Sequence, residues 1–142
     1  MKKIFKIDAA LYPLGLLTAV TGFGFHIAGH GSSHHVWVLW AYAHTLIALM
    51  FVVMIVEHLY THKGWVKGLQ NQAARQKRSV KITCFLALLA LVVVLTGIAL
   101  LAIAGANTHV GLLHYKLGIV FAIFALGHAA KRFHILRKAV KR

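Results

Sequence analysis

The sequence predicts an all-α integral membrane protein, an up-down four-helix bundle that forms a single domain over residues 1–142. Hydrophobic residues make up 60% of the chain, and only two residues are acidic. Four apolar stretches, at about 9–28, 36–60, 80–106 and 110–130, each approach the roughly 20 residues that a helix needs to cross a bilayer. Basic residues gather outside these stretches. Together these observations exclude a soluble globule.

The basic residues also predict how the spans are oriented. Fifteen of the sixteen Lys and Arg residues lie in three segments, 1–6, 63–81 and 131–142. Because such segments stay on the cytoplasmic side, we expect both termini and the connection between spans two and three to be cytoplasmic. The net charge of +14 then indicates attraction to anionic membrane lipid, and nucleic acid is not an expected partner. We therefore expect a multi-pass protein of a bacterial cytoplasmic membrane.

The first span resembles a secretory signal in its basic start, Met1 to Lys6, followed by an apolar run. The run is long enough to cross a membrane and has no persuasive small-x-small cleavage site, so we expect an uncleaved helix. The single cysteine, Cys84, excludes an intrachain disulfide. The sequence has no CxxCH motif, so any haem must be held noncovalently.

Two pairs of histidines lie inside the apolar stretches. His44 and His58 are fourteen residues apart in the second stretch, and His114 and His128 have the same separation in the fourth. Fourteen helical residues rise by about 21 Å and rotate to about 40° short of four turns, so each pair shares one helix face. Phe51 lies halfway between the first pair. An ionisable side chain at membrane depth requires an internal partner, which makes these histidines candidate functional residues.

The predicted topology places one histidine of each span at a similar depth in the membrane as one histidine of the other span. Spans two and four run in the same direction, so His44 and His114 lie near the outer side, while His58 and His128 lie near the inner side. Each level thus offers two imidazoles, as a haem iron requires. Phe51 and its counterpart Phe121 would fill the space between two haems or simply fill the core. Each histidine can instead be a neutral side chain bonded to a helix carbonyl or hydroxyl.

A short internal repeat indicates two related helix pairs. Val20-Thr21-Gly22 resembles Leu95-Thr96-Gly97, at an offset of 75 residues, whereas the histidine pairs are offset by 70. An insertion of five residues in an outer loop reconciles the offsets. Small residues on spans one and three admit a neighbouring backbone or a flat cofactor, or serve ordinary helix packing. They are Gly15, Gly22, Gly24, Gly29 and Gly97.

The two His-x13-His helices resemble the four-helix dihaem bundle of respiratory b-type cytochromes. The run EHLYTHKGW at residues 57–65 is also similar to small bacterial membrane families that resemble cytochrome b. The resemblance implies two noncovalent haem b groups and an electron-transfer function. In the respiratory proteins, paired glycines flank the haems. Gly15 and Gly29 have the matching spacing, but span three offers only Gly97 with alanines, and nothing here corresponds to the helices that build quinone pockets.

Other polar residues are candidates for supporting roles. Lys116 on the outer side and Arg132 on the inner side can each pair with a haem propionate or extend to lipid headgroups. Glu57, the only acidic residue within the predicted spans, can accept a proton or pair with a basic residue of the inner loop.

A second group of histidines lies at the outer end of the first span. His26 and His30 have the i, i+4 spacing that can bind Zn or Cu. His34 and His35 follow in the outer loop. The group can equally form a protonatable surface at which an external partner or substrate binds.

The leading functional prediction is transmembrane electron transfer through two bis-histidine haems, between a quinol or inner donor and an extracytoplasmic acceptor or partner subunit. Two alternatives stay open. One is an enzyme, a quinone-linked oxidoreductase that acts on superoxide or metal ions. The other is a haem-free metal transporter lined by the same histidines.

Overall fold

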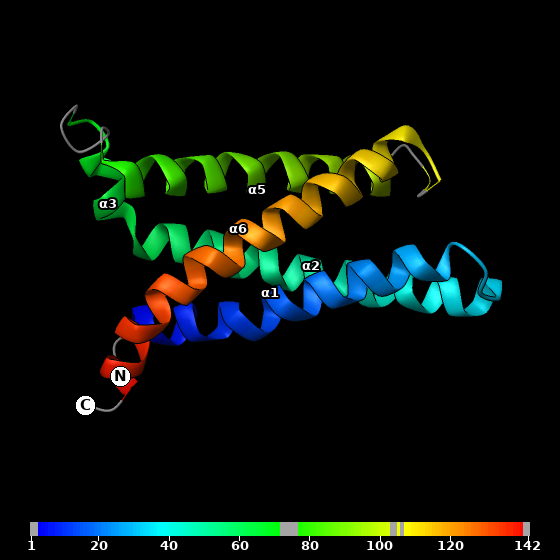
Figure 1. The fold of residues 1–142 in the computed structure, drawn as a ribbon, viewed down its shortest axis with the longest axis horizontal. Coiled ribbons are helices and arrows are strands. Elements are labelled where there is room, and N and C mark those ends of the chain that lie inside the picture. The colour runs from blue at the N-terminus through cyan, green and yellow to red at the C-terminus, as the bar shows by residue number, and fades with distance from the viewer. Residues whose placement is uncertain (1–2, 72–76, 103–104, 106, 141–142) are drawn as a thin grey trace. The chain divides into compact units, whose positions relative to one another are not determined.

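The computed structural model describes residues 3–71, 77–102, 105 and 107–140, and within them every regular element is a helix. The long helices are α1 (Lys3–Ala28), α2 (His34–Thr61), α5 (Arg78–Ala102) and α6 (His109–Val140) (Figure 1). A short helix, α3 (Lys63–Gly68), follows α2 within the basic segment. The predicted end of the third span at Ala106 lies outside the described residues.

All four long helices contain stretches apolar and long enough to cross a membrane: Ile4–Ala28, His34–Thr61, Ser79–Ala102 and His109–Phe133. Their surfaces are those of lipid-facing helices, because large apolar side chains point outward while polar groups are enclosed. The side chain of Ile123 is 64% exposed, whereas that of Thr21 is only 6% exposed. The hydroxyl of Thr21 donates to the carbonyl of Leu17 at 2.7 Å, which satisfies it within its own helix.

The chain divides into two compact units. Residues 1–58 and 132–142 form the first unit, which contains α1 and most of α2, and residues 59–131 form the second, which contains α5 and most of α6. We describe each unit by itself. The prediction of a single domain stays a prediction.

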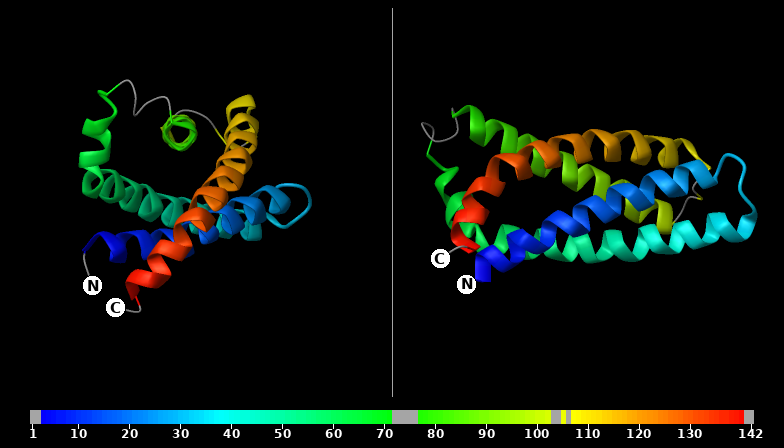
Figure 2. Two further views of the ribbon diagram at one scale, coloured as in Figure 1. Left: turned by 60° about the vertical axis from the view of Figure 1, so that its left-hand side comes forward. Right: turned by 60° about the horizontal axis from the view of Figure 1, so that its bottom comes forward.

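In the first unit, α1 and α2 are antiparallel neighbours (Figure 2) and meet in a regular register. Asp8, Gly15 and Gly22 of α1 lie seven residues apart, and they contact His58, Phe51 and His44 of α2, which are also seven residues apart. A seven-residue repeat keeps the same faces of two helices together over several turns. The face of α2 that the sequence singled out, His44 to His58, therefore lies against α1.

Glycines on α1 allow rings of α2 to approach closely. A Cβ atom at Gly24 would lie 2.6 Å from the indole ring of Trp40, and one at Gly15 would lie 3.3 Å from the ring of Phe51. The far end of α6 joins this unit, where Phe133 contacts Tyr12 edge to face at 6.0 Å between ring centroids.

In the second unit, α5 and α6 contact each other through aromatic and polar side chains. The rings of Phe85 and Phe124 meet edge to face at 5.1 Å between centroids. Further along, Thr96 of α5 contacts His114 of α6. The long apolar helices thus pack in pairs, α1 with α2 and α5 with α6, as expected for a membrane helical protein.

Candidate functional site

His44 on α2 is held against a threonine and a glycine of α1. Its Nδ1 atom lies 3.3 Å from the hydroxyl oxygen of Thr21. Because the hydrogen of that hydroxyl is donated to the Leu17 carbonyl, the oxygen presents a lone pair to the ring, and Nδ1–H is the donor. A Cβ atom on Gly22 would lie 2.9 Å from Cε1 of the same ring. Glycine at this position therefore makes room for the imidazole.

His114 on α6 has the same arrangement with α5. Its Nδ1 atom lies 3.0 Å from the hydroxyl oxygen of Thr96 and 3.1 Å from the carbonyl oxygen of Val93. A carbonyl can only accept, so Nδ1 must carry the hydrogen. A Cβ atom on Gly97 would lie 3.2 Å from Cε1 of the ring. The sequence repeat of Thr-Gly therefore corresponds to one structural unit, a Thr-Gly pair that holds a histidine of the next long helix.

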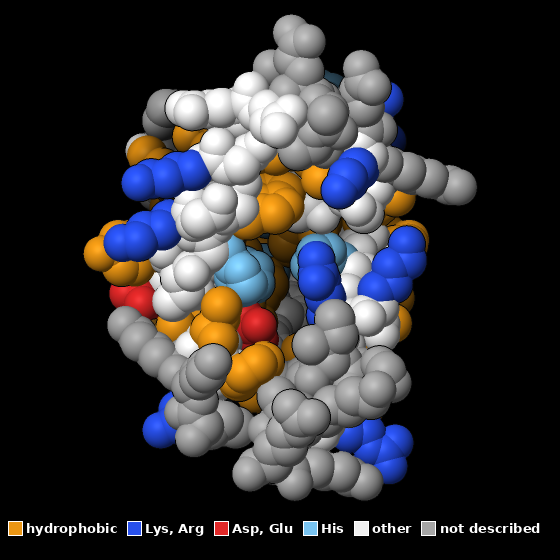
Figure 3. All heavy atoms as spheres, turned by 90° about the vertical axis from the view of Figure 1, so that its left-hand side faces the viewer, with side chains coloured by type: hydrophobic (Ala, Val, Ile, Leu, Met, Phe, Trp, Pro, Cys, Tyr) orange, Lys and Arg blue, Asp and Glu red, His pale blue; other side chains and the backbone are white. Residues whose placement is uncertain are grey.

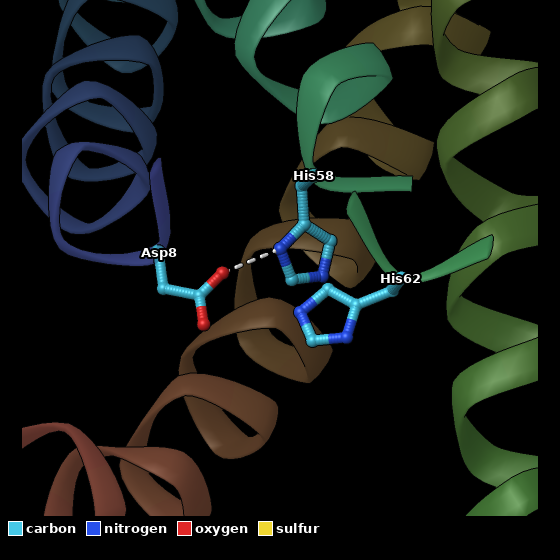
Figure 4. A group of neighbouring side chains, drawn as sticks. All are labelled: Asp8, His58 and His62. Atoms are coloured by element: carbon cyan, nitrogen blue, oxygen red, sulfur yellow. Dashed lines mark hydrogen bonds and ion pairs between the residues drawn. The ribbon is translucent and has the colours of Figure 1, made fainter. Parts of the chain in front are cut away.

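His58, near the end of α2, is held by a carboxylate. Its Nδ1 atom lies 2.8 Å from Oδ1 of Asp8 on α1 (Figure 4). The side chains of His58 and Asp8 are 29% and 27% exposed, so the pair is partly shielded from solvent. The carboxylate accepts, so Nδ1–H is again the donor. Figure 4 also draws His62, which follows four residues later, directly after α2.

Asp8 is a residue of this candidate site that the sequence did not single out. The apolar stretch predicted a first span that begins at about residue 9. The helix instead begins at Lys3, and the candidate span begins at Ile4, so both include Asp8. The expectation that Glu57 is the only acidic residue within a span is therefore wrong. The seven-residue spacing from Asp8 to Gly15 and Gly22 is the signal that could have placed the carboxylate on the same face.

The burial of the other predicted residues differs. His128 on α6 is partly buried, and Lys116 and Arg132 are exposed. Gly15 receives the ring of Phe51, which supports the core-filling interpretation of that phenylalanine. A Cβ atom on Gly29 would lie 3.3 Å from the His26 carbonyl oxygen.

The second histidine group lies at the junction of α1 and α2. The rings of His26 and His30 contact each other edge to face, with centroids 4.8 Å apart. The ring of His34 stacks on Trp37 at 5.8 Å, and His35 is exposed. The structure thus brings His26 and His30 together, as their spacing predicted.

Basic side chains are exposed near the start of α1 and after the end of α2, away from the junction of these two helices. Figure 3 views the left-hand end of Figure 1 and shows exposed Lys and Arg side chains, with histidine visible among them. In the second unit the exposed basic residues include Lys63, Lys67, Lys77 and Lys81, on or beside α3 and α5. Lys63 lies over the ring of Tyr60, with its Nζ 4.9 Å from the centroid.

Comparisons with known proteins do not identify a family. No family model matches the chain, and neither a curated protein nor a solved structure shows a significant match. The class that the fold defines is a multi-pass helical membrane protein with four candidate spans.

Proposed function

We propose that this protein transfers electrons across the cytoplasmic membrane through two noncovalent haem b groups. His44 and His114 would be the axial ligands of an outer haem, and His58 and His128 those of an inner haem. Lys116 and Arg132 remain the candidate partners of the haem propionates. The proposal places both termini in the cytoplasm and arranges the four spans as an up-down bundle.

One observation carries the proposal: three of these four histidines use Nδ1–H as a hydrogen-bond donor. The acceptors are Thr21, Asp8 and, for His114, Thr96 with Val93. A neutral imidazole with its hydrogen on Nδ1 has a lone pair on Nε2, and that lone pair is what binds a metal. Metal-binding histidines are typically oriented in this way by a second hydrogen bond.

Imidazole nitrogens also suit the axial positions of a haem iron. The three histidines lie within apolar helices, in partly buried positions. A haem bound by two histidines has no open iron position and supplies one-electron chemistry. The chain's own residues would bind the iron, fix the imidazole tautomers and exclude water from both levels.

The partners follow from this role. The exposed lysines beside α3 and α5 suit anionic lipid headgroups at the cytoplasmic surface. Electron transfer further requires a donor, such as a quinol, and an extracytoplasmic redox partner.

The first test is a reduced-minus-oxidised absorbance spectrum of the purified protein, with haem and protein quantified. We expect b-type bands and two haems per chain. His58→Ala should retain one haem per chain, because only one level loses a ligand. His35→Ala is a matched control in an exposed position and should retain both haems. A chain purified from haem-supplied cells without b-type bands would contradict the proposal.

A further inference from the structure

The three oriented histidines differ in the charge of the group that accepts Nδ1–H. His44 and His114 donate to neutral oxygen atoms, at 3.3 Å for Thr21 and at 3.0 Å and 3.1 Å for Thr96 and Val93. His58 donates to the carboxylate of Asp8 at the shorter distance of 2.8 Å. Hydrogen bonds to an ionised acceptor are shorter and about twice as strong as neutral ones. The two histidine levels are therefore electrostatically different.

We infer that Asp8 is a positioning residue that lowers the reduction potential of the haem bound by His58, below that of the haem bound by His44 and His114. This inference rests on the proposed function. A carboxylate that accepts Nδ1–H makes the imidazole a more basic ligand. A more basic ligand and a nearby negative charge both stabilise ferric over ferrous iron, and hydrogen bonding and charge around the ligands are among the means by which proteins set haem potentials.

Arg132, near the end of α6, belongs to the same unit and carries the opposite charge. Arg132 is exposed, so solvent screens its charge, whereas Asp8 directly contacts the His58 ring and is 27% exposed. Asp8 is therefore a charge that acts on His58 through a direct hydrogen bond.

The difference between the two reduction potentials would favour one direction of electron transfer. Under the proposed function, an electron added to the fully oxidised protein would rest at the level of His44 and His114, where the reduction potential would be higher. In the proposed topology that level is the outer one. The resting distribution therefore favours electron delivery from the cytoplasmic side toward an extracytoplasmic acceptor.

The test is a redox titration of the purified protein, followed by b-type absorbance and by the low-spin ferric signals in electron paramagnetic resonance. We expect two waves in the wild-type protein. Asp8→Asn keeps a polar side chain of the same size but removes the charge, so it should raise the potential of the lower wave and leave the upper wave in place. Asp8→Glu restores the charge and should move the lower wave back toward the wild-type value.

Two further variants assign the waves. Thr21→Val removes the hydroxyl at His44 and should move only the upper wave. His58→Ala should remove the lower wave. If His58→Ala does not accumulate, the ferric signal that shifts in Asp8→Asn still identifies the haem whose histidine ligand contacts Asp8.

The outcomes separate this inference from the proposed function. Absence of b-type bands in the wild-type protein overturns both. Two haems whose potentials are unchanged in Asp8→Asn, or an upper wave that rises instead, overturn only the role of Asp8.

Discussion

At the scale of single residues, the four intramembrane histidines were predictable because an imidazole within an apolar helix requires a partner. Their partners were only partly predictable. Thr21 and Thr96 appeared in the repeat, but a threonine within a span usually satisfies its hydroxyl in its own helix, so nothing in the sequence linked them to His44 and His114. Asp8 lies directly before the predicted apolar stretch, and hydropathy alone does not connect it to His58.

Gly22 lies so close to the His44 ring that substitution by alanine should displace the ring. Gly22→Ala would place Cβ 2.9 Å from the ring, so His44 must move. We expect a cost of about 1–3 kcal/mol, partly offset by the roughly 1 kcal/mol that alanine gains in a helix, and, under the proposed function, loss of one haem. The measurements are the haem-to-protein ratio and the thermal unfolding midpoint in detergent.

Gly118→Ala is the matched control for Gly22→Ala, because Gly118 also lies within a long helix and a Cβ atom there would meet nothing within 4 Å. It should keep both haems. Equal haem loss in the two variants would contradict the steric explanation.

At the scale of elements, the positions of the spans followed from hydropathy, but their contacts did not. A run of apolar residues with a low amphipathic signal does not show which face meets a neighbour, because lipid and protein are both apolar surroundings. The packing between α1 and α2 depends instead on small residues opposite large rings. Gly15 and Gly29 were expected to flank a haem by analogy, whereas Gly22 is the glycine that contacts a histidine ring.

The contact between Gly24 and Trp40 provides a test of this packing. Gly24→Ala would place Cβ 2.6 Å from the indole ring and should destabilise the pair of helices by about 1–3 kcal/mol. Trp40→Leu should relieve the clash, so the double variant should lose less stability than the sum of the single variants. Unfolding in detergent measures all three proteins. Additive losses would show that the two residues do not interact.

At the scale of the whole molecule, a helical membrane protein with four candidate spans was predictable from composition and span length. The pairing of spans one with two and three with four also agrees with the internal repeat. The pairing of histidines between spans two and four depends on topology, and that topology comes from the distribution of Lys and Arg alone.

The topology can be tested with single cysteines in a Cys84→Ala background. Ser33, between α1 and α2, should be extracytoplasmic, and Asn71, after α3, should be cytoplasmic. A membrane-impermeant maleimide should therefore label Ser33→Cys in intact cells but label Asn71→Cys only after permeabilisation. The reverse pattern would place His58 and His128 at the outer surface.

The seven-residue register of α1 and α2 has a consequence for biogenesis. Asp8, Gly15 and Gly22 contact His58, Phe51 and His44 within one helical hairpin, and Thr96 contacts His114 within another. Each hairpin therefore orients its own imidazoles as soon as its two helices have inserted, before the other hairpin is complete. Under the proposed function, haem binding would be the last step of assembly. It would join two helical hairpins whose histidines are already oriented.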